Sequence, residues 1–148
     1  MMQQGACKFG LWKVAVDYDD LTVHRVRFVR FAPEGQVPIQ FTRFLAGKCR
    51  DLSPLTSSAL SGEGPYAKIY LAVSGIPYGE TRSYTEIAES AGTHPRVVGN
   101  AMARNPTPLI VPCHRVIASS GDLGGFSPDI EIKKALLQME KKYSTSLR

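Results

Sequence analysis

The stretch SYTEIAESAGTHPRVVGNAMARNP, residues 83–106, predicts two short helices joined by a tight turn. Ser83 and Glu86 have the S-x-x-E spacing of a capping box, in which the hydroxyl and the carboxylate bind the free amides at the start of a helix. That helix is predicted over residues 84–91 and ends at Gly92, a residue type that is common at helix ends. The stretch therefore begins with a helix that has a clear start and a clear end.

The second helix of the stretch is predicted over residues 95–104. Pro95 suits its first turn, and it ends before Asn105-Pro106, because the residue that precedes a proline disfavours the helical conformation. The two helices form a helix-turn-helix, with Arg96 at the start of the second helix. The motif occurs in DNA-binding proteins and in ordinary helical cores, so both interpretations stay open. Apolar contacts between the two helices are expected at Ile87, Ala88 and Val98.

A cysteine flanked by basic side chains follows the second helix. The segment NPTPLIVPCHRVI, residues 105–117, predicts a buried extended path that carries Cys113, His114 and Arg115. A thiol is mostly protonated at pH 7, and basic surroundings without acids are expected to increase its thiolate fraction. Neighbouring residues of a strand point to opposite faces, so His114 needs a bend or a bridging water to act on the thiol. The alternative is that Cys113 is a small buried apolar residue.

The last helix offers candidates for an orienting partner of the histidine. Residues 120–125 predict a turn, and Ser127 as N-cap with Pro128 at the first position predicts a helix through residue 142. A histidine that acts as a base needs a group that orients it. The spacing does not choose among three acidic residues of this helix, which are Asp129, Glu131 and Glu140.

The first part of the chain predicts β-structure followed by a short helix. Residues 8–18 and 21–31 are rich in Val, Phe and Trp and flank Asp19-Asp20, which predicts a hairpin. In residues 41–52, phenylalanine and leucine recur at helical spacing and a glycine follows, which predicts a short helix.

A connector separates this part from the rest. Residues 53–65 are rich in Ser, Gly and Pro, and a helix is predicted directly after them over residues 66–75. The expected fold is α/β: a small N-terminal unit of β-hairpin or sheet plus helix, residues 1–60, joined to a mainly α C-terminal domain with the helix-turn-helix, residues 61–148.

Composition limits the class of protein. The chain has 148 residues, of which 43% are hydrophobic and 21% charged, as in globular proteins with a core. No apolar run approaches the roughly 20 residues of a membrane-spanning helix, so no membrane partner is expected. No secretory signal is recognised, and three cysteines without framework spacing predict free thiols. We therefore expect a cytoplasmic protein, or a nuclear one in a eukaryote.

Charge and histidine spacing give two further expectations. The net charge is +5, and no acidic residue lies between Glu89 and Asp122, which favours an anionic partner such as nucleic acid. The sequence has no CxxC pair, and its histidines are not spaced as zinc ligands usually are. Neither a metal nor another cofactor is expected.

Four segments together resemble a known family. NPTPLIVPCHRVI, SYTEIAESAG, PRVVGNAMARNP and GGFSPDIEIKKALLQME are similar to segments of the O6-alkylguanine-DNA alkyltransferases, also called methylated-DNA–protein-cysteine methyltransferases. The resemblance covers residues 66–140 and is weak before them. It implies DNA repair by direct damage reversal, in which the alkyl group of O6-alkylguanine moves irreversibly to Cys113, once per molecule and without a cofactor. O4-alkylthymine is a second candidate substrate.

The resemblance also implies roles for single residues. His114 would deprotonate Cys113 through a water molecule and be held by Glu140. Asn105 would organise the turn that carries the nucleophile, and Tyr84 would donate a proton to the departing guanine. Contacts with the substrate are implied for four residues, which are Met102, Val116, Phe126 and Ser127.

The implied partner is double-stranded DNA, bound in the minor groove by a monomer. The damaged nucleotide would be turned out of the duplex, and Arg96 would fill the space it leaves. Contacts with DNA are implied for six residues, which are Ser83, Tyr84, Arg96, Val97, Gly99 and Asn100.

Some positions depart from the family pattern, and two rival functions remain. The turn over residues 92–96 is shorter than in many members, Val97 is bulkier than the usual alanine, and Phe126 and Pro128-Asp129 alter the rim of the pocket. One rival is an alkyltransferase-like protein that binds lesions without repairing them, although such proteins typically lack the cysteine. The other is a hydrolytic cysteine enzyme, which would turn over repeatedly.

Overall fold

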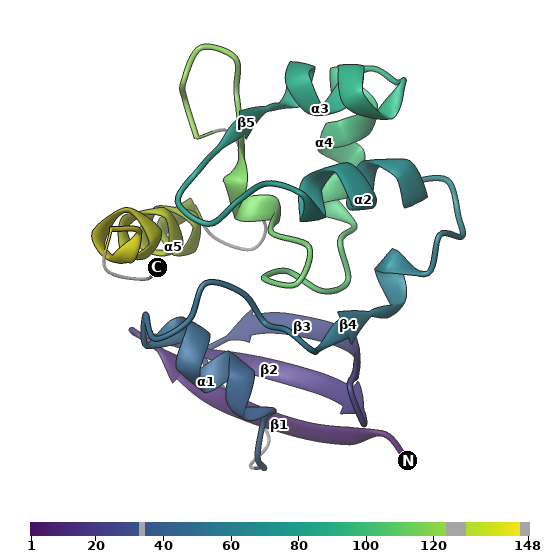
Figure 1. Ribbon diagram of the computed structural model, residues 1–148. Helices are drawn as coiled ribbons and strands as arrows, with labels where there is room; N and C mark the ends of the chain where they lie inside the picture. The colour runs from purple at the N-terminus through teal and green to yellow at the C-terminus, as the bar shows by residue number, and fades with distance from the viewer. Residues whose placement is uncertain (33–34, 124–129, 146–148) are drawn as a thin grey trace.

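The computed structural model describes residues 1–32, 35–123 and 130–145. In this part of the chain, an N-terminal four-stranded sheet lies on one side and most of the helices on the other (Figure 1). This confirms the predicted α/β class. Among the described residues, no helix combines the length and the apolar character that crossing a membrane requires.

The N-terminal sheet is a three-stranded meander with a short fourth strand. β1 (Gln3–Phe9), β2 (Trp12–Asp19) and β3 (Thr22–Val29) are antiparallel to their neighbours. β4 (Thr56–Ser57) pairs in parallel with β3 and lies in the segment predicted as a connector. The resulting strand order is β1-β2-β3-β4.

The prediction of a single strand over residues 8–18 is wrong. Gly10 has a φ of 59°, in the left-handed region that favours glycine, and it forms a two-residue turn with Leu11. Phe9 therefore pairs across the turn with Trp12, and the predicted hairpin is the second half of a meander. The apolar residues on both sides of the turn made the segment look continuous.

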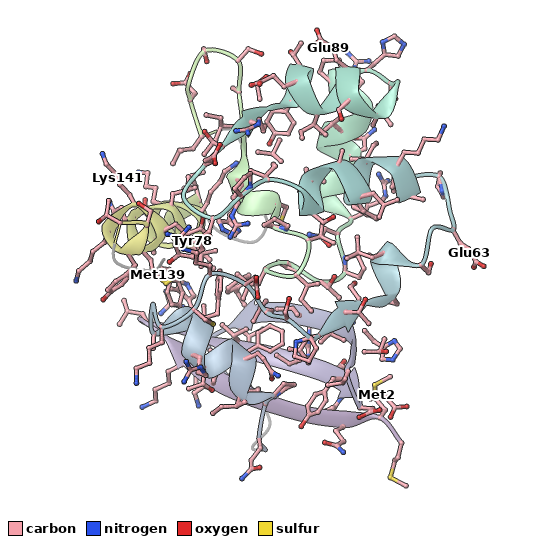
Figure 2. All side chains as sticks on the ribbon, in the orientation of Figure 1. Met2, Glu63, Tyr78, Glu89, Met139 and Lys141 are labelled. Carbon is pink, nitrogen blue, oxygen red and sulfur yellow. The ribbon has the colours of Figure 1, made fainter. Side chains whose placement is uncertain are left out.

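Two helices cover the main apolar core. α1 (Ile39–Leu45) buries Phe41 and Phe44 against the sheet, as its sequence spacing predicted. α5 (Ile130–Tyr143) belongs to the C-terminal half, yet it contributes to the same core. Tyr78 and Met139, which Figure 2 labels, both belong to this core. The main core thus contains residues from both halves of the chain, and the division at residue 60 stays a prediction.

A second core holds the remaining helices together. It is formed by α2 (Ala67–Ser74), α3 (Tyr84–Ala91) and α4 (Pro95–Ala103). The hydroxyl of Tyr70 on α2 donates a hydrogen bond to the carbonyl of Ala101 on α4, at 3.0 Å. The core includes the three predicted contacts between the last two helices, which are Ile87, Ala88 and Val98.

The predicted ends of α3 are confirmed. The Ser83 hydroxyl accepts from the Glu86 amide, and the Glu86 carboxylate accepts from the Ser83 amide, each at 3.0 Å. Gly92 ends the helix with a φ of 71°. Two residues separate Gly92 from Pro95, which opens α4, so α3 and α4 form the predicted helix-turn-helix.

The segment after α4 is less extended than predicted. A 3-10 helix occupies Cys113–Arg115, and it is followed by β6 (Val116–Ile117), which pairs in parallel with β5 (Arg82–Ser83). Pro112, with φ −78° and ψ 68°, directs the chain into this short helix. Prolines in the segment remove amides that a regular strand would need, so the chain turns at the cysteine.

Two hydrogen bonds join the N-terminal sheet to this segment. The amide of Val26 on β3 donates to the carbonyl of Pro106 at 2.8 Å. The hydroxyls of Ser57 and Thr107 lie 2.5 Å apart in a buried position. The sheet therefore holds the chain a few residues before Cys113.

Candidate active site

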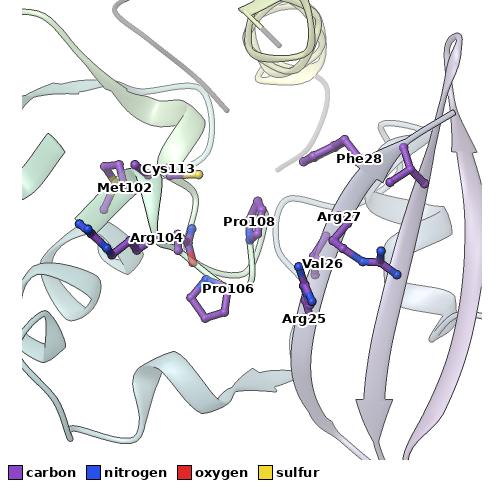
Figure 3. Close-up of a pocket in the computed structure, with 12 residues that line it drawn as sticks. Arg25, Val26, Arg27, Phe28, Met102, Arg104, Pro106, Pro108 and Cys113 are labelled. Carbon is purple, nitrogen blue, oxygen red and sulfur yellow. The ribbon is translucent and has the colours of Figure 1, made fainter. Parts of the chain in front are cut away.

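Cys113 lies at the wall of a cavity between the two halves of the molecule. The cavity has a volume of about 500 Å³, within the range of roughly 300–1,000 Å³ that is usual for small-molecule sites. One wall consists of residues 102–106, Pro108 and Cys113, and the other of β3 residues 25–29 (Figure 3). The Cys113 side chain is buried but borders this space.

Burial dominates the ionisation of the thiol. It raises the pKa of Cys113 to about 11, although a hydrogen bond with Asn105 and the charge of Lys133 act in the opposite direction. The expectation that basic neighbours increase the thiolate fraction is therefore wrong for the resting protein, because desolvation outweighs them. The thiol is protonated at pH 7 and needs a base to become a nucleophile.

His114 is positioned to be that base. Its Nε2 lies 2.5 Å from Oε2 of Glu140, and both side chains are fully buried. Burial lowers the pKa of His114 despite the Glu140 carboxylate, so the ring is neutral at pH 7. With Nε2–H donated to Glu140, Nδ1 carries the lone pair, and it makes no hydrogen bond with any described residue.

Glu140 is the acidic residue that meets the histidine. Glu131 lies exposed on α5 with Lys134 at 3.4 Å, and Asp129 lies outside the described residues. The structure thus selects one of the three candidates that the spacing of the last helix left open.

Glu140 is held as an anion by several donors. It accepts hydrogen bonds from His114, from the Gly79 amide at 3.1 Å, and from Nε and Nη2 of Arg115 at 2.8 and 2.9 Å. Burial alone would raise the pKa of Glu140, but the bonds and charges of His114 and Arg115 lower it to about 2. A permanently charged carboxylate keeps the histidine in one tautomer.

Arg115 is a member of this cluster that sequence reasoning missed. Its Nη1 also donates to the carbonyl of Ile76 at 2.8 Å, so the whole side chain is fixed. The available signal was an arginine inside an otherwise apolar segment, since a buried cation needs an anionic partner.

Lys133 is the second residue that sequence reasoning missed. It is fully buried, its Nζ donates to the carbonyl of Val116 at 2.6 Å, and it lies 6.0 Å from the ring centre of Tyr84. Burial lowers its pKa to about 8, although Cys113 acts in the opposite direction. The signal was its position seven residues before Glu140, which places both on one face of α5.

Asn105 shapes the turn that precedes the cysteine. Its Nδ2 donates to the carbonyl of Val111 at 2.9 Å, and its Oδ1 accepts from the amide of Thr107 at 3.1 Å. Both bonds close the loop between α4 and Cys113. This geometry agrees with the organising role that the resemblance implied.

The remaining predicted site residues fall into three groups. Met102 lines the cavity and Val116 is buried. Phe126 and Ser127 lie outside the described residues, as do Pro128 and Asp129. The implied DNA contacts all lie on or next to α3 and α4: Arg96 and Asn100 are exposed, and Ser83, Tyr84, Val97 and Gly99 are half-buried.

The described residues contain no group of three or more His, Cys, Asp or Glu side chains that could hold a metal ion. The functional groups of the site are a thiol, an imidazole, a carboxylate, a guanidinium and an ammonium. Together they provide a nucleophile, a neutral base and a fixed anion that orients the base.

Comparison with known proteins gives consistent matches. The family model for the DNA binding domain of 6-O-methylguanine DNA methyltransferase matches residues 65–142. Proteins named methylated-DNA–protein-cysteine methyltransferase from Methanothermobacter thermautotrophicus and Sulfolobus acidocaldarius are each 52% identical, over 46% and 49% of this chain. These matches span 39% and 46% of the two relatives, less than half of their length.

Solved structures match almost the whole chain. The Mycobacterium tuberculosis O6-methylguanine methyltransferase has 29% identity and a TM-score of 0.79, covering 97% of this chain and 94% of its own. A structure of Mycobacterium tuberculosis OGT in complex with DNA has 29% identity and a TM-score of 0.80, covering 95% and 93%. The O6-methylguanine-DNA methyltransferase of Pyrococcus kodakaraensis has 26% identity and a TM-score of 0.72, covering 95% and 99%.

Proposed function

This chain belongs to the family of 6-O-methylguanine DNA methyltransferases, and on that basis we propose that it repairs DNA by moving the alkyl group of O6-alkylguanine to its own Cys113. The observation that carries the proposal is a cysteine at a cavity wall, directly followed by a neutral histidine that is locked to a buried carboxylate. The product is a thioether, so each molecule reacts once.

The first step is removal of the thiol proton. Nδ1 of His114 has a free lone pair and accepts this proton, through a water molecule in our proposal. The imidazolium that forms is stabilised by the Glu140 carboxylate, which stays ionised because its pKa is about 2. The sulfur then forms a bond with the alkyl carbon, and the bond between that carbon and O6 breaks.

The second requirement is a proton for the departing guanine. Burial raises the pKa of the Tyr84 hydroxyl, so this side chain is a protonated phenol at pH 7. Tyr84 donates its proton to the guanine as the O6 bond breaks. The buried ammonium of Lys133, 6.0 Å from the Tyr84 ring centre, favours the negative charge that develops on the phenol.

The substrate must reach the cavity outside the duplex. A base inside stacked DNA cannot contact a buried thiol, and turning one nucleotide out costs a few kcal/mol. The helix pair α3–α4 is the DNA-binding element in this proposal, and exposed Arg96 at the start of α4 fills the vacated stack. Duplex DNA with O6-alkylguanine is the proposed partner. The monomeric state and the cytoplasmic or nuclear location stay predictions.

One experiment tests the proposal against both rivals. The protein is incubated with duplex DNA that contains O6-methylguanine, and its peptides are analysed by mass spectrometry over time. One methyl group on Cys113 with a plateau at one equivalent is the expected result. Binding with no modification supports a lesion-binding protein, and product formation beyond one equivalent supports a hydrolytic enzyme.

A further inference from the structure

The cavity beside Cys113 has a second wall that carries positive charge. This wall consists of β3 residues 25–29, and Figure 3 shows Arg25 and Arg27 on β3, with the side chain of Arg27 pointing away from Cys113. Arg25 is exposed and Arg27 half-buried, and Arg104 lies on the opposite wall. Three arginines thus line the space, and none of the lining residues within the described ranges is acidic.

The two β3 arginines are not neutralised within the protein. In the described ranges, neither Arg25 nor Arg27 forms an ion pair. Asp17 is the cross-strand neighbour of Arg25 in the sheet register, yet no ion pair joins the two. Unpaired cations on a strand that borders a cavity attract an anionic ligand.

The strand pattern fixes which face these arginines occupy. Alternate residues of a strand point to opposite faces, and Val26 and Phe28 enter the main core. Arg25 and Arg27 therefore lie on the other face of β3. A shift of β3 by one residue would turn both charges into the core. The alternation of apolar and basic residues therefore fixes the register of this strand.

We propose that Arg25 and Arg27 bind phosphates of the DNA backbone next to the extruded nucleotide, so that the N-terminal sheet is part of the DNA interface. The inference rests on the proposed function, which places that nucleotide in the cavity. A nucleotide turned out of the stack remains joined to its two flanking phosphates, which must therefore pass close to the cavity mouth. The planar guanidinium of arginine matches a phosphate in charge and geometry.

The test compares two double variants that each remove two charges from the same face of the sheet. One is Arg25→Ala with Arg27→Ala. The control is Lys8→Ala with Lys13→Ala, whose side chains are paired across β1 and β2, also one exposed and one half-buried, but outside the cavity wall. Affinity for duplex DNA is measured by fluorescence anisotropy at several salt concentrations.

The arginine variant is expected to bind more weakly and to depend less on salt. The slope of log affinity against log salt falls by about one per lost phosphate contact, or about two in total. Its deficit relative to the unchanged protein therefore shrinks by about tenfold between 50 and 200 mM salt. The lysine variant keeps the original slope. Equal slopes for the arginine variant and the unchanged protein, or equal losses in both variants, would overturn the inference.

A second readout separates this inference from the proposed function. Alkyl transfer is measured from duplex DNA and from the free O6-methylguanine base, and the ratio of the two rates is expected to fall in the arginine variant only. If the unchanged protein shows no alkylation of Cys113 from either substrate, the proposed function fails and the inference with it. If that protein is alkylated and the ratio is the same in both variants, the inference alone fails.

Discussion

The surroundings of Cys113 and the surface of α3–α4 differ in the burial and pairing of their charged side chains. Around Cys113 the charged groups are buried and bonded to one another, and Glu140 joins His114 and Arg115 in one cluster. On the helix pair, Arg96 is exposed and makes no ion pair with any described residue. The proposed chemistry therefore depends on a network that is costly to disturb, whereas the proposed DNA binding depends on groups that can be removed without unfolding the protein.

The largest effect is expected for Cys113→Ala. The substitution removes the atom that accepts the alkyl group, so transfer should fall to zero. Duplex affinity should stay within roughly twofold, because the change from cysteine to alanine is small and the thiol borders the cavity rather than the surface of α3–α4. Mass spectrometry and anisotropy measure the two quantities. Loss of alkyl transfer and duplex affinity together would show that reaction and DNA binding do not depend on separate regions of the molecule.

Glu140→Gln should cost the most stability. The change removes the anion from a buried cluster and leaves Arg115 without its partner, which typically costs about 3–5 kcal/mol. Urea denaturation measures the free energy of unfolding. Glu131→Gln is the matched control on the same helix, and its exposed pair with Lys134 should contribute less than about 1 kcal/mol. Similar losses of unfolding free energy in both variants would show that the buried cluster stabilises the protein no more than an exposed ion pair does.

Arg96→Ala should affect reaction with duplex DNA more than reaction with the free base. Only the duplex requires extrusion of a nucleotide, and loss of about 1.4 kcal/mol of support for that step lowers the rate about tenfold. Single-turnover rates with both substrates give the ratio that matters. Arg43→Ala on α1 removes the same charge far from α4 and should leave the ratio as it is. An unchanged ratio of the two rates for Arg96→Ala would show that Arg96 does not support extrusion of the nucleotide.

The pH profile tests whether His114 is the base. Burial lowers the pKa of His114, with Arg115 and Lys133 acting in the same direction and Glu140 opposing them. The ring can accept a proton only while it is neutral, so the rate with the free base should fall only below this lowered pKa. It should vary by less than roughly threefold between pH 7 and 9, since the pKa of Cys113 is about 11. A steady tenfold rise per pH unit across that range would mean that hydroxide rather than His114 removes the proton.

Gly99→Ala should produce the smallest effect and should move stability and binding in opposite directions. A β-carbon at this helical position meets no atom within 4 Å, so alanine should stabilise the protein by roughly 0.5–1 kcal/mol. The same methyl group faces the proposed DNA surface and should weaken duplex binding. Thermal unfolding and anisotropy measure both. Gly92→Ala is the contrast, because its φ of 71° makes alanine destabilising there.

Local signals in the sequence were sufficient to predict the helix-turn-helix. Ser83 and Glu86 satisfy backbone amides within one turn, and Gly92 needs a conformation that few other residues adopt. Such preferences depend on neighbours in the chain rather than on the rest of the fold. The ends of α3 and the start of α4 therefore agree with the prediction.

The sequence did not predict features that depend on distant partners. Arg115 and Glu140 are 25 residues apart, and nothing local to either one identifies the other. The hydrogen bond of Lys133 with the carbonyl of Val116 likewise joins two segments that only the fold brings together. The pKa of Cys113 was misjudged for the same reason, because burial, which needs the fold, outweighs the basic neighbours that the sequence displays.

The two bonds between the N-terminal sheet and the segment before Cys113 have a consequence for protein engineering. Val26 is hydrogen-bonded to Pro106, and Ser57 to Thr107. Val26 and Ser57 both lie outside the domain that the family model matches. A chimera that grafts residues 65–142 onto a foreign scaffold must therefore supply a substitute strand edge and hydroxyl. Without them the graft contains Cys113 but lacks the two hydrogen bonds that hold the segment before it.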